Sequence, residues 1–260
     1  MCKLKNKKYV KYIIATLFGM VLFLIFENKF MAFNSCAHRF VTKSSLEIIT
    51  KYNNDLSKAG KKVLFKDKDK KFWDTVEEYS LKPDEDEIYG GYKYHFYNFI
   101  TEKNFMNEKD SALNRLDMHF NNAVNEYKSK NYELAYQELG RAIHFLEDLN
   151  TPVHVVYQMP HDAVVKFPLH VKFEKKCDEV CKQISIQEKL DNISSSKLRY
   201  YKVNSLETIA QSSSVLSENN FFGLESNFAK VSEKVANNAV FNALDRVTGL
   251  LYKFFRQVKM

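Results

Sequence analysis

Glycine and proline are scarce in this chain, with 7 and 4 copies among 260 residues. Both residues interrupt helices, so their scarcity leaves long stretches that can form continuous helix. No segment alternates apolar and polar residues between hairpin turns, which is the pattern of half-buried strands. The length suits one sizeable hydrophobic core. We therefore expect an all-α protein with a single compact multi-helix domain.

Cysteine is also sparse, and its spacing argues against a thiolate metal site. Cys2 lies near the N-terminus, and Cys36, Cys177 and Cys181 lie farther along the chain. No Cys-x-x-Cys pair is present. Cys177 and Cys181 are four residues apart on an expected helix, where Cα atoms are about 6 Å apart and the sulfur atoms only sometimes reach each other. We expect both to be buried as small apolar side chains.

The apolar run near the N-terminus is short for a membrane span. Tyr12–Phe26 contains fifteen residues, whereas a transmembrane helix needs about 20. A lysine-rich segment precedes the run, and a cleavage point follows Ala32, as in secretory signal peptides. We expect residues 1–32 to be a hydrophobic leader helix that acts as a signal peptide, so that the protein is secreted. Phe30 stands where signal peptidases prefer a small residue, so an uncleaved anchor carrying an extracytoplasmic catalytic domain remains the alternative.

The net charge gives little support for nucleic-acid binding. The formal charge is +7, but the leader contributes six Lys against one Glu, which leaves +2 for residues 33–260. A protein that binds phosphate backbones usually carries a stronger positive charge. We expect no nucleic-acid partner.

Helical periodicity covers much of the remaining chain. Apolar residues recur at three- and four-residue intervals in four segments: residues 41–52, 111–128, 131–149 and 231–258. Two other segments, residues 65–98 and 186–220, are polar and favour irregular connections. The last periodic segment continues to the C-terminus, so we expect residues 33–260 to form the catalytic domain with no second domain after it.

The strongest chemical signal is a set of histidine and carboxylate residues between His144 and Glu174. The pairs His144/Asp148 and His170/Glu174 are each four residues apart, so each pair projects from one helix face. His154 follows shortly after the first pair. Imidazole nitrogen and carboxylate oxygen are ligands that suit Zn²⁺. The pattern predicts a zinc site.

Two further histidines have weaker contexts. His119 has no partner on its own helix, so we expect it to lie on the surface. His161 precedes His170 in a loop and is a minor candidate for a ligand.

The spacing H-x₃-D-x₅-H-x₁₅-H-x₃-E, with Pro152 two residues before the middle histidine, resembles the bacterial zinc-dependent phospholipase C family. Other segments match that family in the same order. Asn34–His38 resembles the start of its mature chain. Pro83–Asp86, followed by Tyr94–Phe96, resembles its Pro-Asp-Tyr-Asp and His-Phe-Trp elements. The resemblance spans residues 33–258 and implies the all-α fold that this family shares with single-strand nucleases.

The resemblance also implies three zinc ions per chain. The first would be held by Asp84, His95, His144 and Asp148. The second would be held by His154, His170 and Glu174. The third would be held by His38, by Asp148 as a bridge, and by the amine and carbonyl of the mature N-terminal residue, Phe33. The third site therefore depends on removal of the leader.

The implied activity is hydrolysis of the glycerol-side phosphodiester bond of phosphatidylcholine-like phospholipids. Diacylglycerol and a phosphorylated headgroup would be released by a metal-activated water, with Asp84 as the base. Two positions depart from the family. Its mature chain begins with Trp, where this chain has Phe33, and an aromatic residue follows the catalytic Asp, where this chain has Glu85. Glu85 and Tyr92 are the expected headgroup contacts, and Glu85 would alter the preference among headgroups.

Two alternatives stay open at this point. Single-strand-specific zinc nucleases share the fold and most of the histidines, but they close with His-x₃-Asp, whereas this chain has His170-x₃-Glu174. A non-catalytic membrane-anchored homologue would lack the N-terminal ligand. For the phospholipase we expect a monomer whose partner is a phospholipid surface, contacted through Phe221 and Phe222 or through residues 65–73.

Overall fold

A computed structural model describes residues 35–86, 91–157, 159–187, 198, 201 and 204–259. The leader, the domain boundary at residue 33 and the predicted ligand Phe33 lie outside the described residues. Within the described part the regular elements are helices, and the only strand-like feature is an isolated bridge between Asn98 and Lys103. The all-α prediction is confirmed.

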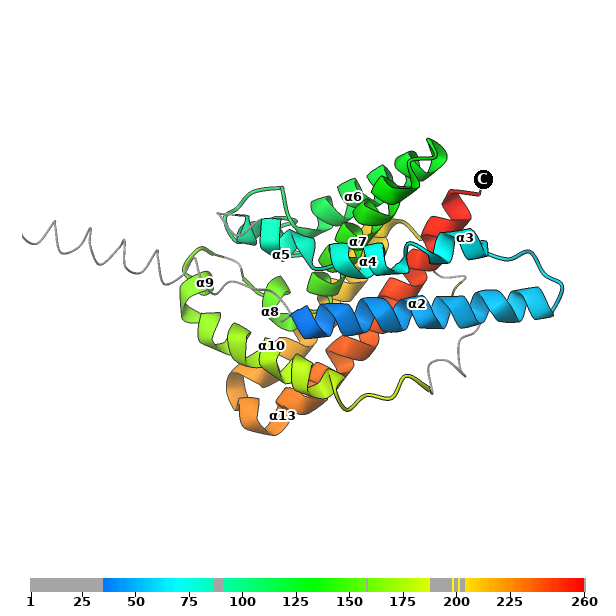
Figure 1. The fold of residues 1–260 in the computed structure, drawn as a ribbon. Coiled ribbons are helices and arrows are strands. Elements are labelled where there is room, and N and C mark those ends of the chain that lie inside the picture. Colours follow the sequence, from blue (N-terminus) through cyan, green and yellow to red (C-terminus); the bar gives the residue numbers. More distant parts are fainter. Residues whose placement is uncertain are drawn as a thin grey trace, which may run out of the picture.

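Helix α13, the longest of the described helices, and four other long helices build the frame of the molecule. The four are α2 (Ser35–Lys58), α6 (Ala112–Lys128), α7 (Tyr132–Leu149) and α10 (Phe167–Cys181). Helix α13 (Leu206–Gln257) is bent at Asn227, where the backbone is non-helical. In Figure 1, α6 and α7 lie above α2, and α10 with the bent region of α13 (orange) lies below it.

Short helices fill the connections between the long ones. They are α3 (Asp67–Lys70), α4 (Trp73–Tyr79), α5 (Lys82–Asp86), the 3₁₀ helix η1 (Tyr92–His95), α8 (Pro152–Val155) and α9 (Asp162–Val165). The prediction of an irregular connection over residues 65–98 was wrong in this respect. Helices of four to seven residues contain too few turns to show an amphipathic period.

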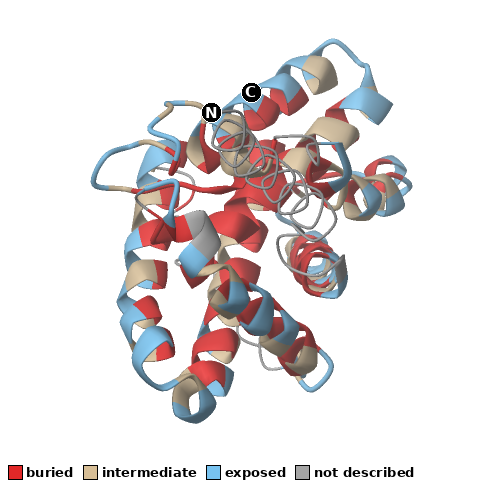
Figure 2. Ribbon diagram, turned by 90° about the vertical axis from the view of Figure 1, so that its left-hand side faces the viewer, coloured by how far each residue is buried: buried red, intermediate tan, exposed pale blue. Residues whose placement is uncertain are grey.

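Helix α7 is the centre of the fold. It packs against α6 and α4, and it also contacts α13 and α2. From Leu139 to Leu149 nearly every residue is buried, and Figure 2 shows buried segments on the inward faces of the helices around it. Helices that are apolar on only one side cover this core. The side chains of His144 and Asp148 on α7 are therefore enclosed by the surrounding helices.

The polar stretch at residues 206–220 is helical, which corrects the prediction of a loop there. The hydroxyl groups of Ser213 and Ser214 are buried and donate to the carbonyls of Ile209 and Ala210, 2.9 and 3.0 Å away. These bonds along the helix satisfy the hydroxyl groups without water. Serine can therefore occupy a buried helix face that its sequence suggests is exposed.

The predicted membrane contacts are mostly buried. Phe65 is 1% exposed, and Phe221 is 2% exposed, whereas Phe222 is 66% exposed. Among the described helices none is both long and apolar enough to cross a bilayer. Cys177 and Cys181 are buried, as predicted, and Cys36 is exposed.

Candidate metal centre

Helix α7 supplies two donors to the centre from adjacent turns. His144 and Asp148 are fully buried, and His144 Nε2 lies 3.3 Å from Asp148 Oδ2. Helix α4 approaches α7 closely at Gly140, and the carbonyl of Ser80, just after α4, accepts a 2.8 Å hydrogen bond from His144 Nδ1. This bond turns Nε2 of His144 toward Asp148.

Two other elements bring Asp84 and His95 to the same point. Asp84, from α5, places Oδ1 3.6 Å from both His95 Nδ1 and His144 Nε2. His95, from η1, places Nδ1 2.9 Å from Asp148 Oδ2 and 2.9 Å from His144 Nε2. A tetrahedral zinc ion with ligands at about 2.0–2.2 Å keeps its donor atoms about 3.3–3.6 Å apart. The observed separations lie close to that range, so these four side chains fit one zinc ion.

A second group lies beside the first. His154, from α8, and His170 and Glu174, from α10, are all buried. Glu174 Oε1 lies 3.4 Å from His154 Nε2 and 2.5 Å from His170 Nε2. Two imidazoles and one carboxylate with no cationic side chain between them suit a second zinc ion.

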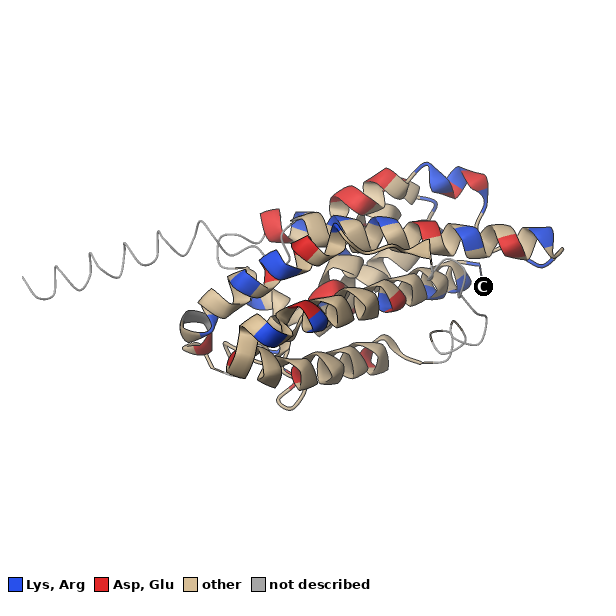
Figure 3. Ribbon diagram, turned by 90° about the horizontal axis from the view of Figure 1, so that it is seen from below, with Lys and Arg blue, Asp and Glu red and all other residues tan. Residues whose placement is uncertain are grey.

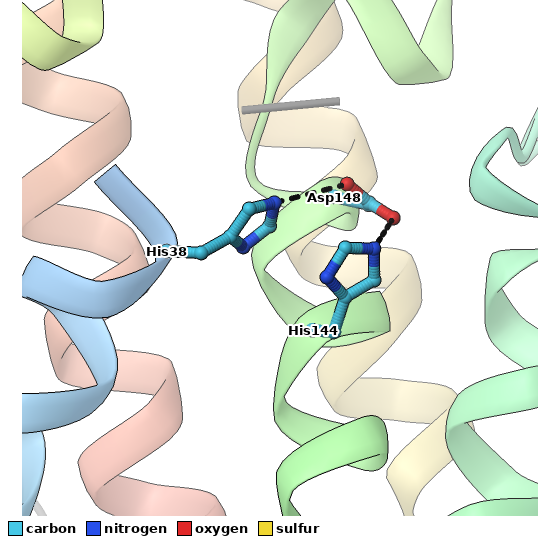
Figure 4. A group of neighbouring side chains, drawn as sticks. All are labelled: His38, His144 and Asp148. Carbon is cyan, nitrogen blue, oxygen red and sulfur yellow. Dashed lines mark ion pairs between the residues drawn. The ribbon is translucent and has the colours of Figure 1, made fainter. Parts of the chain in front are cut away.

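His38, from α2, reaches the first group from the opposite side (Figure 4). Its Nε2 atom lies 4.0 Å from both Asp148 Oδ1 and Asp84 Oδ2, and its ring stacks on that of His144 with 4.3 Å between centroids. Oδ1 of Asp148 is buried, and no hydrogen bond from a described residue reaches it. One carboxylate thus faces two donor groups through its two oxygen atoms. That arrangement suits a bridge between two cations.

The histidines of the second and third zinc groups, His154, His170 and His38, are each oriented by a contact at Nδ1. Nδ1 of His154 donates to the carbonyl of His95 at 3.1 Å, and Nδ1 of His170 lies 3.3 Å from the hydroxyl of Tyr157. Nδ1 of His38 contacts a carboxylate oxygen of Glu147. Such outer contacts orient metal-binding imidazoles. The sequence pattern did not identify Tyr157 or Glu147 as functional residues. Glu147 could have been found, because it lies on the same helix face as His144 and must therefore be buried in the core.

Burial and charge act against each other at these residues. Burial alone would lower the pKa of His144, but the carboxylates of Asp148 and Asp84 raise it to about 10. Burial would raise the pKa of Asp148, but His144, His154 and His95 hold it well below its usual range. Burial raises the pKa of Glu174 to about 7 and lowers that of His170 to about 4. Packing so many ionisable groups together without solvent is costly unless cations compensate the carboxylates.

The structure therefore brings eight of the nine predicted ligands into one centre. The remaining predicted site residues lie differently. Glu85 is exposed and forms a 2.7 Å ion pair with Lys82, and Tyr92 is half-buried against Phe105. Asp84 is the most exposed of the eight, at 8%.

The two other histidines lie outside the centre. His119 is buried, and its Nδ1 atom lies 2.8 Å from Glu138 Oε2 on α7. The prediction that it lies on the surface was wrong, because its partner is on the next helix rather than its own. His161 is mostly exposed and lies near Asp162.

Comparison with known families agrees with this geometry. Residues 38–217 match the family model for zinc dependent phospholipase C. The chain belongs to the zinc-dependent phospholipase C family. The matched segment contains all eight donors of the centre, which supports zinc as the metal.

Related proteins show the same family at lower coverage. The chain is 33% identical over 110 residues to a phospholipase C of Paraclostridium bifermentans, which covers 38% of this chain and 27% of that protein. It is 27% identical over 150 residues to a phospholipase C of Clostridium novyi, which covers 53% of this chain and 36% of that protein. The chain thus matches about a third of the length of these relatives.

Solved structures share the fold. The alpha toxin from Clostridium absonum superposes with a TM-score of 0.69 and 24% identity, over 85% of this chain and 63% of the toxin. The alpha toxin of an avian strain of Clostridium perfringens gives a TM-score of 0.67 and 21% identity, over 88% of this chain and 66% of the toxin. At this identity the comparison shows the helical fold.

Proposed function

We propose that this protein is a phospholipase C that hydrolyses the glycerol-side phosphodiester bond of phosphatidylcholine-like phospholipids. The observation that carries the proposal is the shared carboxylate Asp148, which faces one donor group through Oδ2 and a second through Oδ1. Adjacent cation sites suit a phosphodiester, which carries a negative charge and gains more in the transition state. The family match supports the same reaction class.

The reaction breaks one bond and forms one. Zinc ions in these groups would neutralise charge on the phosphodiester oxygens and on the leaving alkoxide. The oxygen of water bonds to phosphorus as the glycerol-side P–O bond breaks, so the water loses a proton and the diacylglycerol alkoxide gains one. Asp84 would accept the proton from water; the proposal is supported by its being the most exposed carboxylate among the donor residues. Asp148 and the histidines hold the centre.

The proposed complement is three zinc ions. Two groups are supplied by described side chains alone, and the third includes His38 and Asp148. The amine and carbonyl of Phe33 would complete the third site once the leader is removed. Binding of the third zinc ion would therefore be coupled to cleavage of the leader during secretion. Mass spectrometry of the secreted protein tests this directly, and a chain that still begins at Met1 would refute it.

Glu85 is proposed to set the headgroup preference. It lies on α5 beside Asp84 and projects a carboxylate into solvent. A carboxylate attracts both a quaternary ammonium and a primary amine, and it does so without the steric selection of an aromatic ring. Relative rates on choline and ethanolamine lipids should change in Glu85→Tyr; unchanged ratios would remove Glu85 from the headgroup site.

The deciding experiment compares hydrolysis of phosphatidylcholine vesicles and of single-stranded DNA by the zinc-loaded protein. Asp84→Asn should lose lipid hydrolysis by at least 10²-fold, because a general base contributes about 10²–10⁴-fold. Asp86→Asn is the matched control, since Asp86 also lies on α5 but pairs with Arg141 at the surface. It should retain the wild-type rate.

The outcomes separate the candidate reactions. Cleavage of DNA with no cleavage of lipid would refute the phospholipase proposal in favour of a nuclease. The mixed charge of the surface agrees with the lipid prediction, since Lys and Arg alternate with Asp and Glu along α2 and α10 in Figure 3. A phosphate-backbone binder would gather positive charge on one face.

A further inference from the structure

Glu147 is a buried carboxylate next to the metal centre, but it is not one of the eight zinc-donor residues. It lies on α7 directly before Asp148 and is fully buried. Its two oxygen atoms contact His38 and Thr42, both on α2, rather than the donor groups around Asp148. A carboxylate in such a position is strongly destabilising unless its partners compensate its charge.

The contacts of Glu147 are arranged around one imidazole. Oε2 contacts Nδ1 of His38, and Oε1 accepts a 3.0 Å hydrogen bond from the hydroxyl of Thr42, one helical turn farther along α2. The threonine therefore fixes the rotamer of Glu147, and Glu147 fixes the ring of His38. With Nδ1 engaged in this way, Nε2 of His38 points toward Asp148 Oδ1 and Asp84 Oδ2, each 4.0 Å away.

Two other histidines of the centre are hydrogen-bonded to neutral groups. His144 and His154 donate through Nδ1 to backbone carbonyls, those of Ser80 and His95. An ionised carboxylate in the same role would make the imidazole a stronger donor to a cation than a backbone carbonyl does.

We propose that Glu147 is a positioning residue that orients His38 and strengthens its binding to zinc. The inference rests on the assignment of zinc to His38 in the proposed function, but it does not depend on which ester is hydrolysed. The side-chain oxygens of Glu147 contact His38 and Thr42. Its effect passes through one ring nitrogen of His38.

The test measures zinc affinity of the metal-stripped protein, after removal of the leader, by competition with a chromophoric chelator. Glu147→Gln keeps the shape of the side chain but removes its charge. Loss of an outer-shell partner typically weakens metal binding by about 10–100-fold. We expect that loss for one zinc ion per chain, with the affinities of the others unchanged.

Two further variants distinguish positioning from general support. Thr42→Val removes the hydroxyl that fixes Glu147, and should weaken the same zinc ion by a smaller factor. In a double-mutant cycle, His38→Ala combined with Glu147→Gln should bind no more weakly than His38→Ala alone, because both changes remove one interaction.

The matched control is Glu138→Gln. Glu138 lies on the same helix and contacts a histidine Nδ1 atom, that of His119, at 2.8 Å, but this pair lies outside the metal centre. Its zinc affinities should equal those of the wild type. Wild-type affinity of every zinc ion in Glu147→Gln would overturn the inference. So would an equal loss at all sites, or additive losses in the cycle, since both would indicate a role in the scaffold alone.

Discussion

Replacement of Gly140 by alanine tests how the α4–α7 contact supports the metal centre. A Cβ atom at Gly140 would lie 2.7 Å from the carbonyl oxygen of Val76 and 2.8 Å from Cβ of Tyr79. Ordinary contact begins at 3.4 Å, so α4 must move away by about 0.7 Å. Two opposing effects decide the result. Alanine favours helix over glycine by about 1 kcal/mol, while overpacking costs about 1–3 kcal/mol.

The overpacking effect should dominate, because the atoms that must move belong to or adjoin the backbone of α4. We expect Gly140→Ala to lower the free energy of unfolding by up to about 2 kcal/mol. At about 2–4 °C for each kcal/mol, the melting temperature of the metal-free protein should fall by several degrees. Ser80 follows α4 directly and should move with it, which lengthens its 2.8 Å hydrogen bond from His144. Zinc affinity should therefore fall as well.

Gly223→Ala provides the matched control. The added Cβ at Gly223, within α13, would lie 3.6 Å from Cγ2 of Val231, an ordinary contact. That variant should unfold at the same temperature as wild type or slightly above it, with unchanged zinc affinity. Thermal unfolding in the presence of a chelator and a zinc titration measure both quantities. If Gly140→Ala were as stable as Gly223→Ala, the steric argument would be refuted.

Three further predictions concern zinc and pH. Asp148→Asn should retain fewer zinc ions per chain than Glu174→Gln, because Asp148 faces two donor groups and Glu174 faces one. Metal analysis after dialysis measures the two zinc contents, and equal contents would contradict the role of Asp148 as a bridge. Removal of zinc by chelation should lower the free energy of unfolding by about 2.7 kcal/mol per site that is held at 100 times its Kd; an unchanged melting temperature would exclude zinc as a structural component. Burial acts to raise the pKa of Glu138, but the hydrogen bond and charge of His119 lower it below 4.5. Because the folded pKa lies below the unfolded one, this pair stabilises the protein above about pH 4.5, and the stabilisation is lost as the pH falls through the folded pKa. The difference in stability between wild type and Glu138→Gln should therefore shrink in acid, and a difference that grows in acid would reverse the assignment.

Local spacing in the sequence was enough to predict part of the fold and part of the centre. Four predicted helical segments lie within α2, α6, α7 and α13 or extend beyond them by one residue. The pairs His144/Asp148 and His170/Glu174 depend only on the pitch of one helix, so a separation of four residues already places their side chains together. Errors arose where polarity was taken for exposure. The serines at the start of α13 satisfy their hydroxyl groups within the helix, so the sequence shows no apolar face there.

Contacts between elements could not be predicted in this way. His119 looked solvent-exposed because Glu138 is on the neighbouring helix, and Glu147 went unnoticed because its partners lie on α2, more than 100 residues away. The sequence alone determined the helical class, the zinc-type donors and the family resemblance, because these follow from residue type and short-range spacing. The resemblance implied that His38, Asp84 and His95 meet Asp148, and the tertiary structure brings them together. Only the tertiary structure decided that Glu147 holds His38. These contacts depend on how separate helices pack around α7, and that packing is a property of the whole core.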